Sequence, residues 1–339
     1  MNKTLVAAAG LAILGSTVAS AQKLNASGAT FPAPIYQKWF GEFSAKNKGV
    51  QINYAPNGSG GGIKDLTDGV VDFAASDRPM TDKEIAAVKS KPLHFPTVLG
   101  AVVITYDIPG FAGELKLTPD TAAGIFIGTI KKWNDPKLMA DNPGAKLPNE
   151  EIQTVHRSDN SGTTFVFTDY LCKVSDAFKA KVGGGPAQKV SWPVEASAGS
   201  GNPGVAGQIK QTPMSVGYVE LTYAIQNKMP YATLKNAAGV WIKPTQESVT
   251  AAAAAASKSI PEDFRTSITN QNSKAAYPIS TFTYLLIPTV WSDAAKKKTV
   301  ITFLNWMLTD GQKGAAGLDY APLPADIVAR DKKQIAMIK

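Results

Sequence analysis

The hydrophobic positions of the chain change repeatedly between two periods. Residues 50–54 alternate between apolar and polar side chains, as a half-buried strand does. The segment before them spaces its aromatic residues three and four positions apart, as the buried face of a helix does: Tyr36, Trp39, Phe40 and Phe43. Strand-like and helix-like segments continue to alternate toward the C-terminus, without an internal repeat. This pattern predicts an α/β protein.

Two long apolar runs interrupt this alternation, at residues 95–106 and 278–287. Each is typical of a buried strand, and each is a candidate crossing between two domains. The 339 residues are enough for two domains that each bury a core. We therefore predict two lobes, each a mixed sheet flanked by helices, joined by a two-segment hinge. The first lobe is expected to hold residues 22–100 and 280–339, and the second residues 101–279.

Residues 1–21 have the features of a secretory signal peptide. An apolar stretch at 5–14 follows Lys3 and is too short to span a bilayer. Ala19 and Ala21 form a small-x-small cleavage pattern, which predicts Gln22 as the first mature residue. The alternative is a buried N-terminal helix. The pattern predicts export to the periplasm, and no later apolar stretch is long enough to span a membrane.

Composition and charge narrow the possible partners. A hydrophobic content of 44% with 18% charged residues is typical of a globular chain. The net charge of +8 becomes +7 once Lys3 is removed with the signal peptide, which suits an anionic ligand. The sequence has no stripe of alternating basic and aromatic residues, so it gives no sign of nucleic-acid binding. The lysine run at 296–298 is expected to lie on a solvated helix surface. Cys172 is the only cysteine, so no intrachain disulfide can form and a free, buried thiol is expected.

The strongest chemical signal lies at residues 157–163, between a β-rich segment and a helix-like one. Ser161, Gly162 and Thr163 would begin that helix, where backbone N–H groups have no partner and the helix dipole favours an anion. Arg157 offers a planar fork that matches a tetrahedral oxyanion, and Asp159 can hold that guanidinium by pairing with it. The alternative is that the stretch only caps the helix.

Two further turns have a similar composition. Thr30 and Phe31 precede a helix whose first turn carries Pro32 and Pro34. Ser59 lies among four glycines directly before another helix, where the backbone can curl its N–H groups toward a ligand. A capped helix and a flexible turn are the respective alternatives.

An acidic residue, Asp77, ends the apolar run 71–76. Ligands of open α/β sheets gather at the carboxyl ends of strands, so Asp77 is a candidate site residue. The alternative is that it caps a helix expected at residues 81–88.

Taken in order, these motifs resemble the periplasmic phosphate-binding protein of bacterial phosphate ABC transporters. The likeness covers essentially the whole mature chain, and it includes residues 28–34, 58–61, 71–77, 130–135, 157–163 and 217–220. The resemblance implies a two-lobed periplasmic-binding-protein fold that closes on one phosphate. It places phosphate contacts at Thr30, Phe31, Ser59, Asp77, Arg157, Ser161, Gly162 and Thr163, with Asp159 pairing with the site arginine.

Some positions depart from that family's pattern, with Asn160 where relatives carry Gly and Gly60 where they carry Ser. Neither change removes an expected ligand group. The implied partners are inorganic phosphate and a membrane permease, and a monomer without cofactor is expected.

The resemblance gives Asp77 a role. Phosphate near neutral pH carries a proton that a carboxylate can accept, whereas sulfate carries none. A carboxylate facing unprotonated sulfate oxygens would disfavour sulfate by about 1–3 kcal/mol or more. Arsenate is also protonated, so this device is expected to reject it poorly.

Two other functions stay open. A secreted phosphatase or phosphoryl-transfer enzyme could use the same anion site, although His94 and His156 have no motif spacing, and His156 is expected to point to the other face of its strand. The sequence shows no cluster of His and acidic residues that would predict a metal site. A binding protein for sulfate or molybdate is the other alternative, which Asp77 argues against.

Overall fold

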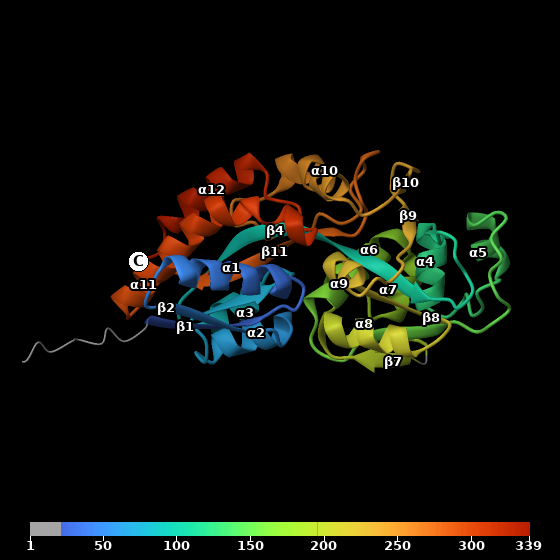
Figure 1. The fold of residues 1–339 in the computed structure, drawn as a ribbon, viewed down its shortest axis with the longest axis horizontal. Coiled ribbons are helices and arrows are strands. Elements are labelled where there is room, and N and C mark those ends of the chain that lie inside the picture. The colour runs from blue at the N-terminus through green and yellow to red at the C-terminus, as the bar shows by residue number, and fades with distance from the viewer. Residues whose placement is uncertain (1–21, 195) are drawn as a thin grey trace, which may run out of the picture.

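The computed structural model describes residues 22–194 and 196–339, so the predicted signal peptide lies outside the described residues. Strands and helices alternate along the chain as predicted, and helices cover both faces of a large sheet (Figure 1). Its strands are β1 (Gln22–Gly28), β2 (Val50–Ala55), β3 (Phe73–Ser76), β4 (Pro92–Asp107), β6 (Gln153–Arg157), β7 (Ala196–Gly199), β8 (Ser215–Glu220) and β11 (Ser280–Pro288).

The helices are α1 (Ala33–Lys46), α2 (Ser59–Thr67), α3 (Asp82–Ala87), α4 (Pro119–Phe126), α5 (Pro136–Asp141), α6 (Gly162–Val174), α7 (Asp176–Lys181), α8 (Gly201–Gln211), α9 (Leu221–Gln226), α10 (Gln246–Ala256), α11 (Ala294–Trp306) and α12 (Ala325–Ile335). A small sheet has the order β10-β9-β5, from β5 (Lys116–Leu117), β9 (Thr233–Lys235) and β10 (Trp241–Ile242). Among the described residues, no helix combines the length and the apolar character that crossing a membrane requires.

Local sequence explains the helices that later border the site. The aromatic residues predicted to face the core of α1 are all buried, and proline stands in the first turn, where no N–H is needed. The glycine-rich turn leads directly into α2, as predicted, with Gly58 at a φ of 92° that only glycine adopts readily.

One strand, β4, runs through both halves of the molecule. It pairs with β11 from Pro92 to Ala101 and with β8 from Val102 to Asp107. The two lobes therefore share one eight-stranded sheet, in the order β2-β1-β3-β11-β4-β8-β6-β7. The pairing partner of β4 changes between Ala101 and Val102, one residue after the lobe boundary predicted between residues 100 and 101, and that boundary stays a prediction.

The second apolar run forms β11, which lies between β3 and β4 and so belongs wholly to the sheet of the first lobe. The chain returns from the second lobe just before this strand, because the Ile279 carbonyl accepts the Val102 N–H at 2.9 Å. Both crossings therefore lie side by side, as a hinge requires.

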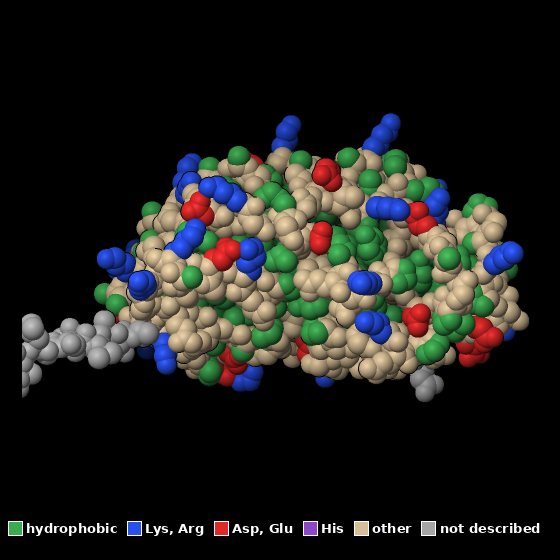
Figure 2. Space-filling view, viewed as in Figure 1, with side chains coloured by type: hydrophobic (Ala, Val, Ile, Leu, Met, Phe, Trp, Pro, Cys, Tyr) green, Lys and Arg blue, Asp and Glu red, His purple; other side chains and the backbone are tan. Residues whose placement is uncertain are grey.

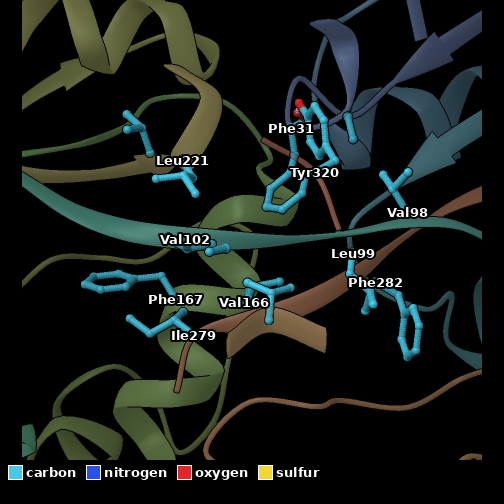
Figure 3. Close-up of a cluster of buried hydrophobic side chains, with 14 of the residues drawn as sticks. Phe31, Val98, Leu99, Val102, Val166, Phe167, Leu221, Ile279, Phe282 and Tyr320 are labelled. Carbon is cyan, nitrogen blue, oxygen red and sulfur yellow. Dashed lines mark hydrogen bonds between the residues drawn. The ribbon is translucent and has the colours of Figure 1, made fainter. Parts of the chain in front are cut away.

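Apolar packing is continuous across this crossing. Figure 3 shows Val98, Leu99 and Val102 along β4, with side chains from both lobes gathered around the strand. Phe31 and Tyr320 approach from the first lobe, and these side chains are buried. The crossing is therefore part of the core.

Charged side chains of both signs are dispersed over the face in Figure 2. Lys296 lies on α11, where it pairs with Asp72 at 2.8 Å.

Cys172 is a free thiol, as predicted. It is half-buried, whereas a buried thiol was predicted, because it lies at the edge of the packed face of α6.

Candidate functional site

The loop between β6 and α6 forms the centre of the candidate site. Ser161 is the N-cap of α6, and its Oγ accepts the Thr164 N–H at 3.0 Å. The capping interpretation is therefore correct for this hydroxyl oxygen. The next two amides, of Gly162 and Thr163, have no hydrogen-bond partner within residues 22–194 and 196–339. Capping leaves these two donors available to an anion.

Arg157 is held by two neighbours. Its Nε and Nη2 donate to the two carboxylate oxygens of Asp159 at 2.7 and 2.6 Å, and its Nη1 donates to Thr163 Oγ1 at 3.1 Å. Burial raises the pKa of Asp159, but the hydrogen bonds and charge of Arg157 outweigh it and leave this pKa below its usual range. The pair stays ionised and keeps the buried guanidinium oriented.

Asp77 is buried directly after β3. Its Oδ1 accepts the Thr283 hydroxyl at 2.9 Å, and its backbone N–H donates to Ser59 Oγ at 3.1 Å. The capping interpretation of Asp77 is wrong, because Thr81 caps α3 in a capping box with Glu84. Burial raises the pKa of Asp77 from 3.8 to about 7, against the opposing effects of Thr283 and Arg157.

The two lobes meet at Gly162. A Cβ built on this glycine would lie 2.1 Å from Ser59 Oγ and 2.6 Å from Asp77 Oδ2, so only a glycine fits. Nearby, the Gly60 N–H donates to the Asn160 carbonyl at 2.9 Å. The groups of α2 and β3 thus lie directly against the first turn of α6.

The turn that carries Thr30 and Phe31 lies on the same cleft. The carbonyls of these two residues accept the hydroxyls of Tyr223 at 2.6 Å and Tyr320 at 2.7 Å. Thr30 Oγ1 accepts two N–H groups of Asn202, whose side chain also donates to Thr163 Oγ1 at 3.1 Å. The structure therefore brings all of the predicted site residues to one place.

Sequence reasoning assigned no role to four residues that border the site, namely Thr283, Tyr223, Tyr320 and Asn202. Asn202 lies in a glycine-rich entry to a helix, α8, at residues 197–207, and Thr283 lies in the apolar run 278–287, which predicted a buried strand but no ligand group. The hydrogen bonds of Thr283, Tyr223 and Tyr320 join positions that are far apart in the chain rather than sequence neighbours.

A hollow of about 510 Å³ lies beside these groups, lined from both lobes by Thr30, Asp159 and Gly201 among others. The site side chains themselves are almost fully buried, since Arg157 is only 4% exposed and Asp77 only 2%. Neither Arg157 nor Asp77 lines this hollow, so it borders the buried groups without containing them.

The raised pKa of Asp77 predicts a pH-dependent effect on stability. The unfolded carboxyl ionises near pH 4, whereas the carboxyl buried between the closed lobes ionises near 7, so unfolding of the closed form releases a proton between these values and the group destabilises the closed, ligand-free form as pH rises. We expect Asp77→Asn to raise the free energy of unfolding increasingly from pH 4 to 7, by up to roughly 4 kcal/mol, and to level off above. Urea unfolding in phosphate-free buffer across pH 4–8.5 measures this, and a difference that does not change with pH contradicts it.

Comparisons with known proteins place the chain in a family. Residues 15–311 match the model of the PBP superfamily domain. The chain is 43% identical to the phosphate-binding protein PstS of Xylella fastidiosa over 90% of this chain and 83% of the relative. It is 40% identical to the phosphate-binding protein PstS of Haemophilus influenzae over 93% of both chains.

Solved structures share the fold at lower identity. A high-affinity periplasmic phosphate-binding protein, PfluDING, solved with bound phosphate, superposes with a TM-score of 0.70 at 24% identity, over 91% of this chain and 92% of the other. A phosphate-binding protein from Stenotrophomonas maltophilia gives 0.69 at 20% identity, over 92% and 94%. With the match to the superfamily model and the identity to curated relatives over most of both chains, this protein belongs to the PstS family of the PBP superfamily.

Proposed function

We propose that this protein binds inorganic phosphate between its two lobes and delivers it to the membrane permease of a phosphate ABC transporter for import. The observation that carries the proposal is a buried guanidinium, Arg157, whose charge acts on a buried carboxyl, Asp77, together with unpaired amides from both lobes in the described part of the chain. Its relatives in the PstS family are named for phosphate binding.

The donors suit a small tetrahedral anion. In the described part of the chain, the amides of Phe31, Ser59, Gly162 and Thr163 make no hydrogen bond. They come from turns in both lobes, so an anion placed among them would join the lobes. Backbone amides and a guanidinium orient several oxygens at once, and burial strengthens each of these interactions.

Asp77 would read the protonation state of the ligand. Its carboxylate can accept a hydrogen bond from a phosphate O–H, whereas every oxygen of sulfate is an acceptor and would face it unpaired. Binding energy that depends on a ligand proton selects phosphate over sulfate. The same reasoning predicts poor rejection of arsenate.

We expect Asp77→Asn to reduce the preference for phosphate over sulfate by at least about tenfold, because the amide can donate to an unprotonated oxygen. Titration calorimetry of both proteins against phosphate, arsenate and sulfate measures this preference. If the variant still gives no heat with sulfate, Asp77 is not the selectivity element.

The enzymatic alternative needs a nucleophile, base or metal at the same anion site. His94 Nε2 accepts the Met80 N–H at 2.9 Å, and burial lowers the pKa of His94 to about 4. His156 stacks on Trp192, with ring centroids 5.6 Å apart. His156 Nδ1 also lies 2.9 Å from the backbone carbonyl of Arg157, so the contacts of both imidazoles are with groups other than the Asp77 carboxyl and the Arg157 guanidinium. A phosphatase assay with and without added divalent metal tests the alternative, and turnover would support it.

Export to the periplasm is part of the proposal. The cleavage pattern of residues 1–21 supports it, and binding proteins of this kind supply their permease from that compartment. Fractionation of cells that express the full chain, with sequencing of the mature N-terminus, tests the proposal. An uncleaved chain in the cytoplasm would contradict it.

A further inference from the structure

We propose that Asn202 is a positioning residue that turns two hydroxyls of the site into obligatory hydrogen-bond donors. The inference rests on the proposed phosphate-binding function and concerns how the same site recognises an anion. Asn202 lies in the first turn of α8, and its side chain is fully buried. It is a site component beyond the residues expected to contact phosphate.

The side-chain amide of Asn202 bridges two site threonines. Its Nδ2 donates to Thr30 Oγ1 at 2.9 Å and to Thr163 Oγ1 at 3.1 Å. Its Oδ1 accepts the backbone N–H of Glu220 at 2.9 Å. This last bond fixes the orientation of the amide, because a flipped amide would set Nδ2 against that N–H and leave the hydroxyl side without a donor.

Each threonine oxygen then has both acceptor positions filled. A hydroxyl donates one hydrogen bond and accepts two. Thr30 Oγ1 accepts a hydrogen bond from the Nδ2 of Asn202 and a second one, at 3.1 Å, from the backbone N–H of Asn202. Thr163 Oγ1 receives the Nδ2 of Asn202 and the Nη1 of Arg157, also at 3.1 Å.

Donation is the one hydrogen-bonding capacity left to both hydroxyls. An oxyanion accepts from such groups, whereas a ligand that offers donors finds no acceptor in them. Arg157, Thr163 and Asn202 all belong to the second lobe, so the Thr163 hydroxyl is oriented before the lobes close and the ligand spends less free energy on ordering it.

The bridge also joins the lobes. Thr30 precedes α1 in the first lobe, while Thr163 and Asn202 belong to α6 and α8 in the second. The contact between Thr30 and Asn202 is therefore possible only when the lobes have come together. Asn202 couples closure of the lobes to orientation of the donors.

Titration calorimetry with phosphate tests this role in four proteins: wild type, Asn202→Ala, Asn202→Asp and Asn142→Ala. We expect affinity to fall about tenfold in Asn202→Ala and at least 30-fold in Asn202→Asp, whose carboxylate would draw the hydroxyl protons to itself. Asn142 is also a buried amide, and it bonds the backbone of Lys116 and Leu138, away from the site. Asn142→Ala should lower the melting temperature while affinity stays within about twofold of wild type.

A double-mutant cycle separates positioning from general support of the fold. In a Thr163→Val background one of the two hydroxyls is gone, so Asn202→Ala should weaken binding by a smaller factor than in wild type. Equal factors in the two backgrounds, or unchanged affinity in Asn202→Ala, would overturn the inference even if Asn202→Asp fails to fold. Wild-type protein that binds no phosphate would instead refute the proposed function itself.

Discussion

Replacing Gly162 by alanine should abolish most of the affinity for phosphate while leaving the fold intact. The added methyl would lie 2.1 Å from Ser59 Oγ and within 3 Å of the Asp77 side chain, which belong to the opposite lobe. Neither of these short, buried side chains can move away, so the lobes must stay apart. Overpacking of this kind costs about 3 kcal/mol, which is roughly a 100-fold loss of affinity.

The same substitution should not destabilise the ligand-free protein. Gly162 is the first residue of α6 and has no positive φ, and alanine favours a helix over glycine by up to about 1 kcal/mol. Once the lobes separate, nothing opposes the methyl. Unchanged or raised stability together with lost affinity would therefore identify a wedge between lobes and not a damaged fold.

Gly207→Ala is the matched control. This glycine lies in α8, and a Cβ built on it meets nothing within 4 Å. Calorimetry should find its phosphate affinity within about twofold of wild type, with stability unchanged or slightly higher. If Gly162→Ala also binds like wild type, the lobes do not need to close at this point.

Replacing Arg157 by methionine should weaken phosphate binding by at least about 1,000-fold. Removing one partner of a buried, hydrogen-bonded charge pair costs about 2–5 kcal/mol, and the ligand also loses its main cation. Arg157→Lys keeps the charge but not the planar fork, and we expect a loss of at least about tenfold. Calorimetry, or competition with a labelled ligand, measures both. Arg265→Met is a suitable control, since Arg265 pairs with Asp82 and Asp263 away from the site.

A second substitution tests whether Asp159 acts through Arg157. In wild type, Asp159→Asn should weaken binding, because the amide keeps one acceptor, sets an NH2 donor against the guanidinium in place of the other, and removes the charge that pairs with it. In the Arg157→Met background the same change should have no further effect, or should recover some affinity by removing an unpaired acid next to the anion. An equal loss in both backgrounds would mean that Asp159 acts on the ligand directly.

Local pattern was enough to predict the elements that carry the site. The aromatic spacing of α1, the glycine-rich start of α2 and the change from strand to helix after Arg157 are all features of short segments, and the structure has each of them. Sequence also suggested that Asp159 pairs with Arg157, two positions away, and the structure contains that pair.

Contacts between distant segments were not predictable in the same way. Thr283 lies in an apolar run that was typical of a buried strand, yet its hydroxyl bonds Asp77 across 206 positions of sequence. Asn202 bonds Thr30 across 172 positions. No periodicity or composition reveals such pairs, because they depend on how the strands are ordered and how the lobes meet.

The shared sheet has a similar explanation. The two long apolar runs were expected to cross between lobes with separate sheets, and β4 does span both. Its continuity arises because β11 and β8 pair with consecutive parts of one strand, and strand order is a tertiary property. The alternative that Asp77 caps a helix is wrong because Thr81, four residues later, forms the capping box.

The central claim is that one phosphate lies between the lobes, held by groups from both. A crystal structure of the mature protein with phosphate tests this most directly. The account predicts a phosphate within hydrogen-bond distance of the Gly162 and Thr163 amides, the Arg157 guanidinium and the Asp77 carboxyl. Phosphate bound elsewhere, or a site whose ligand touches only one lobe, would contradict it.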